Sequence, residues 1–156
     1  MSQIEIKTEG PVTRLKIRGP FDELTKMPEN LKCTTVVIDL EEMTTFNSMG
    51  VRIWLTWTKA KKGFTELRLE NCRPNFMKQV VFVAGVLPPY AQVESFYVPY
   101  FAPDSQEQID VKFTLGKEYD KTGLHLPTPT HKGKELELDV DDNYFEFIKG
   151  PKKAGA

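Results

Sequence analysis

The first part of the chain alternates apolar and polar residues and then becomes almost continuously apolar. The alternation covers residues 4–8 and 12–18, which are separated by the turn-forming residues EGP. A period of two predicts strands, and the Gly-Pro pair between them predicts a β-hairpin. The next apolar run, TTVVIDL at residues 34–40, is rich in β-branched residues. Such a run is typical of a strand buried on both faces, so we expect it at the centre of a sheet.

Helical spacing predicts two main helices further along the chain. The first covers residues 48–62 and ends in lysines followed by Gly63, and the second covers residues 74–84 with a proline near its start. Lysine and glycine are favoured at helix C-termini, and proline in the first turn. A short helix at residues 21–27 and strands at residues 66–70 and 92–98 complete the pattern. This order predicts an α/β fold, with helices covering a mixed β-sheet.

The last third of the chain has a different composition. Residues 99–156 contain many charges and several prolines, with strand-like pieces at residues 109–114 and 135–140. This length is too great for a loop and too small for an ordinary independent domain. We therefore predict a first domain at residues 1–98, a small β-rich appendage packed on it at residues 99–148, and a flexible tail at residues 149–156.

Composition and charge exclude several classes of function. The chain has 156 residues, of which 40% are hydrophobic, and 21 basic residues nearly balance 22 acidic ones. No long-range field therefore favours nucleic acid or a membrane surface. The polar N-terminus lacks a signal segment, and the longest apolar run, residues 80–87, is too short to span a bilayer. We expect a soluble cytoplasmic protein whose two cysteines, Cys33 and Cys72, are reduced and packed.

The sequence contains none of the common catalytic motifs considered below. The glycines form neither a GxGxxG nor a GxxxxGK loop, and there is no GxSxG sequence. The two histidines, His125 and His131, both lie in the appendage. Paired carboxylates at residues 41–42 and 141–142 lie in polar turns, where solvated surface is the default. We predict neither catalytic activity nor a cofactor.

The junction between the central strand and the first helix resembles a known family. Asp39 and Leu40 end the strand, and Asn47-Ser48-Met49-Gly50-Val51 opens the helix. This order resembles the STAS domain of bacterial anti-sigma-factor antagonists, in which a strand ending in Asp-Leu is followed by a loop and Asp-Ser-Ser/Thr-Gly-Leu. The hairpin, the strand TELRLEN and the helix ending AGVL also lie where that fold expects them, so the resemblance covers roughly residues 4–98.

The resemblance implies a non-catalytic signalling module switched by phosphorylation. In that family a partner kinase, which is also the anti-sigma factor, phosphorylates the loop serine and so blocks association. Ser48 is the only serine of this loop and becomes the phosphorylation candidate. The sequence departs from the family pattern at Asn47, which replaces an acidic residue, and at Met49, which replaces a second hydroxyl residue. The alternative is that Asn47 or Ser48 only caps the helix.

The first helix has an unusually wide apolar surface. Its apolar residues, Val51, Ile53, Trp54, Leu55, Trp57 and Ala60, cover about half of the circumference. A helix lying on a sheet usually needs a narrower stripe, so part of this surface is available to a partner. We predict a protein partner, kinase-like or another signalling protein, bound by Asn47, Ser48, Met49, Gly50, Arg52, Trp54 and Trp57. The alternatives are that both tryptophans are core, that the domain senses a nucleotide or lipid, or that it is a structural subunit.

The appendage has the outline of a zinc ribbon without the ligands. Residues 102–105 and 128–131 stand where the two cysteine pairs of a ribbon would be, and no cysteine lies beyond Cys72. Asp104, His125 and His131 do not have a spacing that requires a metal. We predict a degenerate, metal-free unit. The side chains expected to hold it together are Phe101, Phe113, Leu136, Tyr144 and Phe147.

Overall fold

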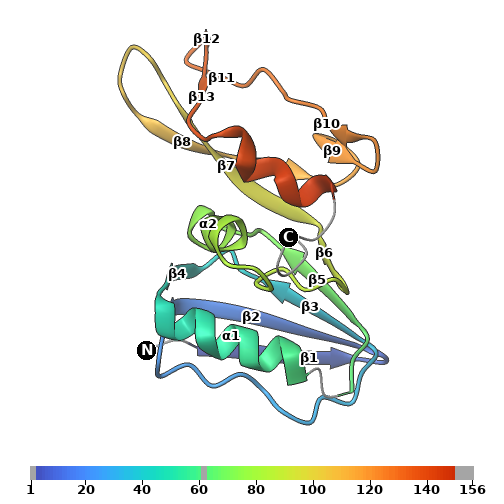
Figure 1. Cartoon of the computed structure of the whole chain (residues 1–156). Coiled ribbons are helices and arrows are strands. Elements are labelled where there is room, and N and C mark those ends of the chain that lie inside the picture. Colours follow the sequence, from blue (N-terminus) through green and yellow to red (C-terminus); the bar gives the residue numbers. More distant parts are fainter. Residues whose placement is uncertain (1–2, 61–62, 150–156) are drawn as a thin grey trace.

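A computed structural model describes residues 3–60 and 63–149 of the chain. Its first sheet has the strand order β1-β2-β3-β5-β6 (Figure 1). These strands are β1 (Gln3–Glu9), β2 (Val12–Phe21), β3 (Thr35–Asp39), β5 (Glu66–Glu70) and β6 (Ala91–Val93). β1 and β2 form the predicted antiparallel hairpin, and the other neighbours are parallel. β3 lies at the centre of the sheet, as its apolar sequence predicted.

One face of this sheet forms the main core. The side chains that β2, β3 and β5 place on this face, namely Leu15, Ile17, Val36, Ile38, Leu67 and Leu69, are almost completely buried. The opposite face carries ion pairs such as Arg14–Glu70 and Arg18–Glu5. These pairs are partly exposed to water and contribute little to stability. The buried face therefore dominates the energetics of the sheet, at about 25 cal/mol for each Å² of apolar surface removed from water.

The structure contains three helices in the described ranges. They are α1 (Ser48–Ala60), α2 (Pro74–Phe82) and the 3₁₀ helix η1 (Asp142–Lys149). The first two match the predicted helices, although residues 61–62 lie outside the described residues. The short helix predicted at residues 21–27 is wrong, because β2 continues to Phe21 and the Asp22 side chain then accepts the backbone N–H of Leu24 to form a turn. None of the described helices is long and apolar enough to cross a membrane.

The C-terminal unit, residues 95–149, contains its own small sheets. β7 (Ser95–Phe101) pairs with β8 (Gln108–Thr114) and with β13 (Glu137–Leu138). Two-residue strands form the pairs β9 (Tyr119–Asp120) with β10 (Gly123–Leu124) and β11 (Thr130–His131) with β12 (Lys134–Glu135). The strand predicted at residues 92–98 is in fact β6 and β7, which belong to different sheets. The predicted domain boundary at residue 98 therefore lies inside β7.

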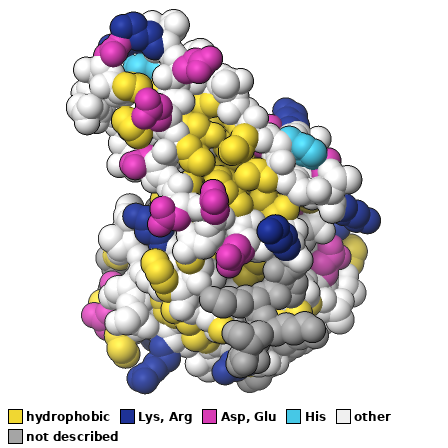
Figure 2. Space-filling view, turned by 45° about the horizontal axis from the view of Figure 1, so that its top comes forward, with side chains coloured by type: hydrophobic (Ala, Val, Ile, Leu, Met, Phe, Trp, Pro, Cys, Tyr) yellow, Lys and Arg dark blue, Asp and Glu magenta, His cyan; other side chains and the backbone are white. Residues whose placement is uncertain are grey.

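Aromatic packing holds the C-terminal unit together. Phe113, Leu136 and Tyr144 are buried as predicted, whereas Phe101 and Phe147 are half-buried. Figure 1 shows this unit on the α2 side of the first sheet, and Figure 2 shows hydrophobic side chains reaching its surface between acidic ones. The Tyr144 hydroxyl donates to the carbonyl of Tyr97 over 2.7 Å and fixes η1 on β7. Of the predicted tail, Lys149 ends η1 and residues 150–156 lie outside the described residues.

The predicted fold class is wrong. Strands account for 41% and helices for 21% of the described residues, in several small sheets, so the protein is mostly β. This is not the helix-covered α/β fold that the resemblance implied. The reason is that β4 (Met43–Phe46) and the two-residue strands from β9 to β11 are too short to produce an alternating pattern. The sequence predicts no strand at these positions, so the predicted strand content is too low.

Candidate partner-binding site

The start of α1 is capped by Asn47. Its side-chain Oδ1 accepts the backbone N–H of Gly50 over 2.8 Å, and its carbonyl accepts the N–H of Val51 over 2.9 Å. This is the geometry of an N-cap, in which a side-chain oxygen satisfies a backbone donor of the first turn. Asn47 therefore caps α1. Ser48 is left as the first helical residue with no part in the cap.

The tip of this junction is open to solvent. Asn47 and Ser48 are exposed, Met49 is 44% exposed, and the Ser48 hydroxyl has no hydrogen-bond partner among the described residues. Gly50, by contrast, is buried against the backbone of Phe21. The predicted site residues of the first turn thus divide into an exposed group that a partner can reach and a glycine that positions the helix.

The two tryptophans of α1 lie in different environments. Trp54 is 1% exposed, and its Nε1 donates to the carbonyl of Val86 over 2.7 Å. It packs edge-on against Phe76, so it belongs to the core and cannot contact a partner in this conformation. Trp57 is half-buried, and its Nε1 donates to the carbonyl of Pro28 over 2.9 Å. Of the two predicted anchors, only Trp57 remains in the candidate site.

A groove runs between α1 and the irregular segment at residues 26–31, and we call it the α1 groove. Its volume is about 630 Å³. The apolar lining comes from Ile53 and Trp57 on α1, from Met27 and Leu31 on the segment opposite, and from Phe64. The Trp57 and Phe64 rings stack with centroids 5.2 Å apart, which fixes one end of the floor. The volume lies within the range of ordinary ligand sites, roughly 300–1,000 Å³.

Charged side chains border the α1 groove. Lys26 and Arg52 lie on its rim together with Glu29, and all three are exposed. Arg52 was predicted from the sequence, whereas the residue 26–31 wall was not. This wall has no helical or strand period, and its signal is limited to two apolar residues, Met27 and Leu31, within a polar stretch. The rim has an excess of positive charge, which favours an acidic partner.

The α1 groove is lined mainly by apolar and neutral polar side chains, with three charged ones. The described residues that line it include no cysteine, histidine or aspartate. Cys72 lies elsewhere, and burial raises the pKa of its thiol, so it stays protonated and unreactive. Burial, followed by the hydrogen bond to Glu41, raises the pKa of Tyr97 to about 12. Neither group can act as an acid or base near neutral pH.

The two segments compared above with the cysteine pairs of a zinc ribbon lie close together in space. Residues 102–105 and 128–131 approach each other: Lys134 pairs with Asp104, and His131 Nε2 lies 3.0 Å from Glu107 Oε2. A cavity of about 450 Å³ lies beside them. Within the described ranges, no group of three or more His, Cys, Asp or Glu side chains could hold a metal ion. These polar contacts link the two turns.

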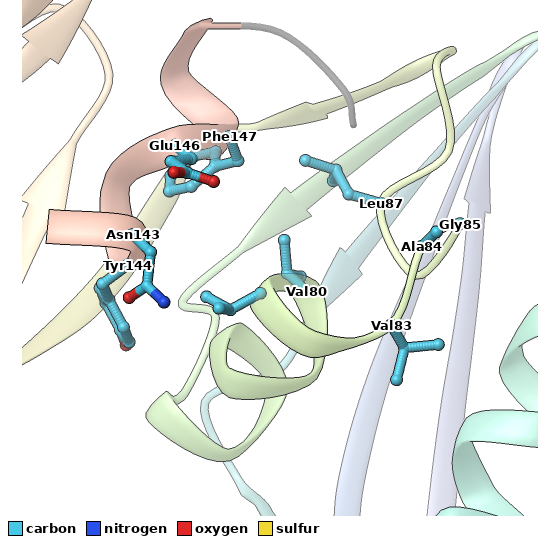
Figure 3. A pocket seen from close by; sticks show the side chains of 10 residues that line it. Val80, Val83, Ala84, Gly85, Leu87, Asn143, Tyr144, Glu146 and Phe147 are labelled. Atoms are coloured by element: carbon cyan, nitrogen blue, oxygen red, sulfur yellow. The ribbon is translucent and has the colours of Figure 1, made fainter. Parts of the chain in front are cut away.

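A smaller cavity lies between α2 and η1. Its volume is about 120 Å³, and Figure 3 shows Val80, Leu87 and Phe147 around it. The space is below the size of an ordinary ligand site. We interpret it as imperfect packing between two short helices, and it does not compete with the α1 groove as a binding site.

The sequence matches no protein-family model and no curated protein.

Proposed function

We propose that this protein is a non-catalytic regulatory module that binds a partner protein in the α1 groove. The observation that carries the proposal is an apolar groove of about 630 Å³ beside an exposed helix start. Grooves beside a helix commonly receive one apolar face of an amphipathic helix, with anchors at positions i, i+3 or i+4, and i+7. Because Lys26 and Arg52 border the groove, the partner segment is an acidic amphipathic helix. We place the module in the cytoplasm, where buried free thiols stay reduced.

The proposed site is tested first with synthetic helical peptides. Two peptides share one apolar face and carry either glutamates or lysines on the other, and Trp57 fluorescence reports occupancy of the groove. We expect the acidic peptide to bind with a micromolar Kd and the basic peptide to bind at least about tenfold more weakly. Equal binding of the two peptides, or no binding of either, contradicts the proposed partner chemistry.

The variant Ile53→Arg places a charge on the apolar floor and is expected to weaken peptide binding at least about tenfold. Leu126→Arg is the matched control, because Leu126 is an exposed leucine far from the groove-lining residues. In a bacterial lysate, a genuine partner is retained by the wild type and by Leu126→Arg but lost by Ile53→Arg. A protein retained equally by all three binds elsewhere. Thermal melting of each variant confirms that it is folded.

Ser48 is the proposed switch of this module. Phosphorylation adds a charge of about −1.5 to −2, and Arg52 lies one helical turn further on, at the spacing where side chains pair. A phosphate would therefore draw Arg52 from the groove rim and repel an acidic partner. This mechanism is of the anti-sigma-antagonist type that the resemblance implies, with a kinase-like ATPase or another signalling protein as the partner.

We expect Ser48→Asp to weaken binding of the acidic peptide about threefold to tenfold, and Ser48→Ala to leave it unchanged. Ser105→Asp is the control, because Ser105 is another exposed serine and lies in the C-terminal unit. Titration of the three variants with one peptide preparation measures the effect. If Ser48→Asp binds as tightly as Ser105→Asp, the switch is rejected while the groove itself remains in place.

A second candidate is a small apolar ligand in the same groove. The volume of the α1 groove favours this candidate, because it would accommodate a fatty acid chain. Lys26 or Arg52 would then be available to bind the carboxylate. Saturable quenching of Trp57 by decanoate, with a rise in Tm that Ile53→Arg abolishes, would favour ligand sensing. Competition between decanoate and the acidic peptide shows whether the two share one site.

A further inference from the structure

The edge strand β1 is the longest unpaired edge in the first sheet. β1 pairs with β2 along one side only, and no strand in the described ranges pairs with its other side. All its residues except Ile4 are exposed, and the large apolar side chain of Ile6 is 54% exposed. An open edge of this length is a template for pairing with another chain, and proteins normally shorten or cover such edges.

The hairpin turn determines which backbone groups face this open edge. Gly10 has φ of 58°, and Pro11 follows it, as in a type II′ turn closed by the pair Glu9–Val12. Because hydrogen-bonded pairs alternate along an antiparallel ladder, the odd-numbered residues of β1 bond to β2. The N–H and C=O groups of Ile4, Ile6 and Thr8 therefore point to the open edge.

The charge pattern of β1 is self-complementary around Ile6. In an antiparallel pair of two β1 strands with Ile6 opposite Ile6, Glu5 lies opposite Lys7 on both sides of the axis. A shift of two residues in either direction keeps the same backbone groups facing the partner strand, but both of these shifted registers are unfavourable. One places Glu5 opposite Glu5, and the other places Lys7 opposite Lys7. Opposite charges across strands stabilise a pair and like charges destabilise it, so one register is selected.

We propose that a second copy of this chain pairs with β1 in this register, so that the two sheets join across a twofold axis at Ile6. The contact is isologous, as in most symmetric dimers, and it closes both open edges at once. It buries the exposed Ile6 side chains against each other and forms two Glu5–Lys7 pairs. The interface is small, so the dimer forms at micromolar protein concentration. It is separate from the α1 groove and does not depend on the proposed function.

Sedimentation equilibrium over a range of protein concentrations tests this dimer. We expect a monomer–dimer equilibrium that weakens as salt screens the two charge pairs. Ile6→Lys places two ammonium groups at the axis and should raise the dimer Kd at least about tenfold. Leu126→Lys is the matched control, because Leu126 is an aliphatic residue of almost the same exposed fraction, 55%, and lies in the C-terminal unit, so its replacement should leave the Kd nearly unchanged.

Mixing two charge-reversal variants tests the proposed register and shows whether a variant is monomeric because of its charges or because it is misfolded. Glu5→Lys and Lys7→Glu should each be monomeric alone, because each brings like charges together. Mixed in equal amounts, they should form a heterodimer, because each copy then presents the charge that the other lacks. A wild-type protein that stays monomeric up to millimolar concentration overturns the proposal. A dimer that tolerates Ile6→Lys, or single variants that stay monomeric when mixed, also overturns it.

Discussion

Replacing Gly50 with alanine is expected to lower the free energy of unfolding by about 2–3 kcal/mol, a large effect for one added methyl group. The new Cβ would lie 2.1 Å from the carbonyl oxygen of Phe21 and 2.8 Å from its carbonyl carbon. Both are backbone atoms, and the Phe21 ring is itself buried edge-on against Phe46 and Trp54. Alanine favours a helix over glycine by up to about 1 kcal/mol, which is too little to offset this overlap.

Urea unfolding measures the change, with Met49→Ala as the control on the same helical turn. Met49 is 44% exposed, and its replacement should alter stability by about 0.5 kcal/mol or less. Gly50→Ala should also shift α1 away from β2, and this shift should weaken peptide binding in the α1 groove. If Gly50→Ala were as stable as the wild type, α1 would not approach Phe21 closely, and the geometry of the candidate site would be wrong.

Elements with a long, regular pattern could be predicted from the sequence. The β1–β2 hairpin, the central strand β3 and the helices α1 and α2 each repeat a period over several residues, and the structure contains them all. The two-residue strands of the C-terminal unit have no period to detect. One of them, β9, contributes Tyr119 to the aromatic cluster around Phe96, which is a tertiary effect. The fold class was wrong for this reason, although the individual long elements were correct.

The candidate site was predictable on one side only. The sequence of α1 indicated an apolar surface wider than a helix needs for packing on one sheet. In the structure, Arg52 and Trp57 line the α1 groove. The opposite wall at residues 26–31 is irregular chain, positioned by a bond from Trp57 to the carbonyl of Pro28. Trp54 and Trp57 are separated by only about 60° around the helix. Sequence alone could not assign one to the core and the other to the groove.

The C-terminal unit depends on Phe96, and Phe96→Ala is expected to lower the free energy of unfolding by about 3–5 kcal/mol. The side chain is 0% exposed and is the common neighbour of rings from β8, β9 and η1. The centroid distances are 5.4 Å to Phe113, 5.2 Å to Tyr119, 6.2 Å to Tyr144, 6.3 Å to Phe145 and 4.9 Å to Phe147. Its removal leaves a cavity where separate short elements meet.

Phe82→Ala is the matched control, because it deletes the same atoms from a side chain that is 76% exposed at the end of α2. Its effect on urea unfolding should be about 0.5 kcal/mol or less. Hydrogen exchange then locates the damage: in Phe96→Ala, amide protection should fall in β8 and η1 while β3 and β5 retain it. This follows because aromatic packing joins η1 to β7 and β8, so local opening of η1 becomes easier than global unfolding. Equal loss of protection throughout the chain would instead mean that the two parts unfold as one cooperative unit.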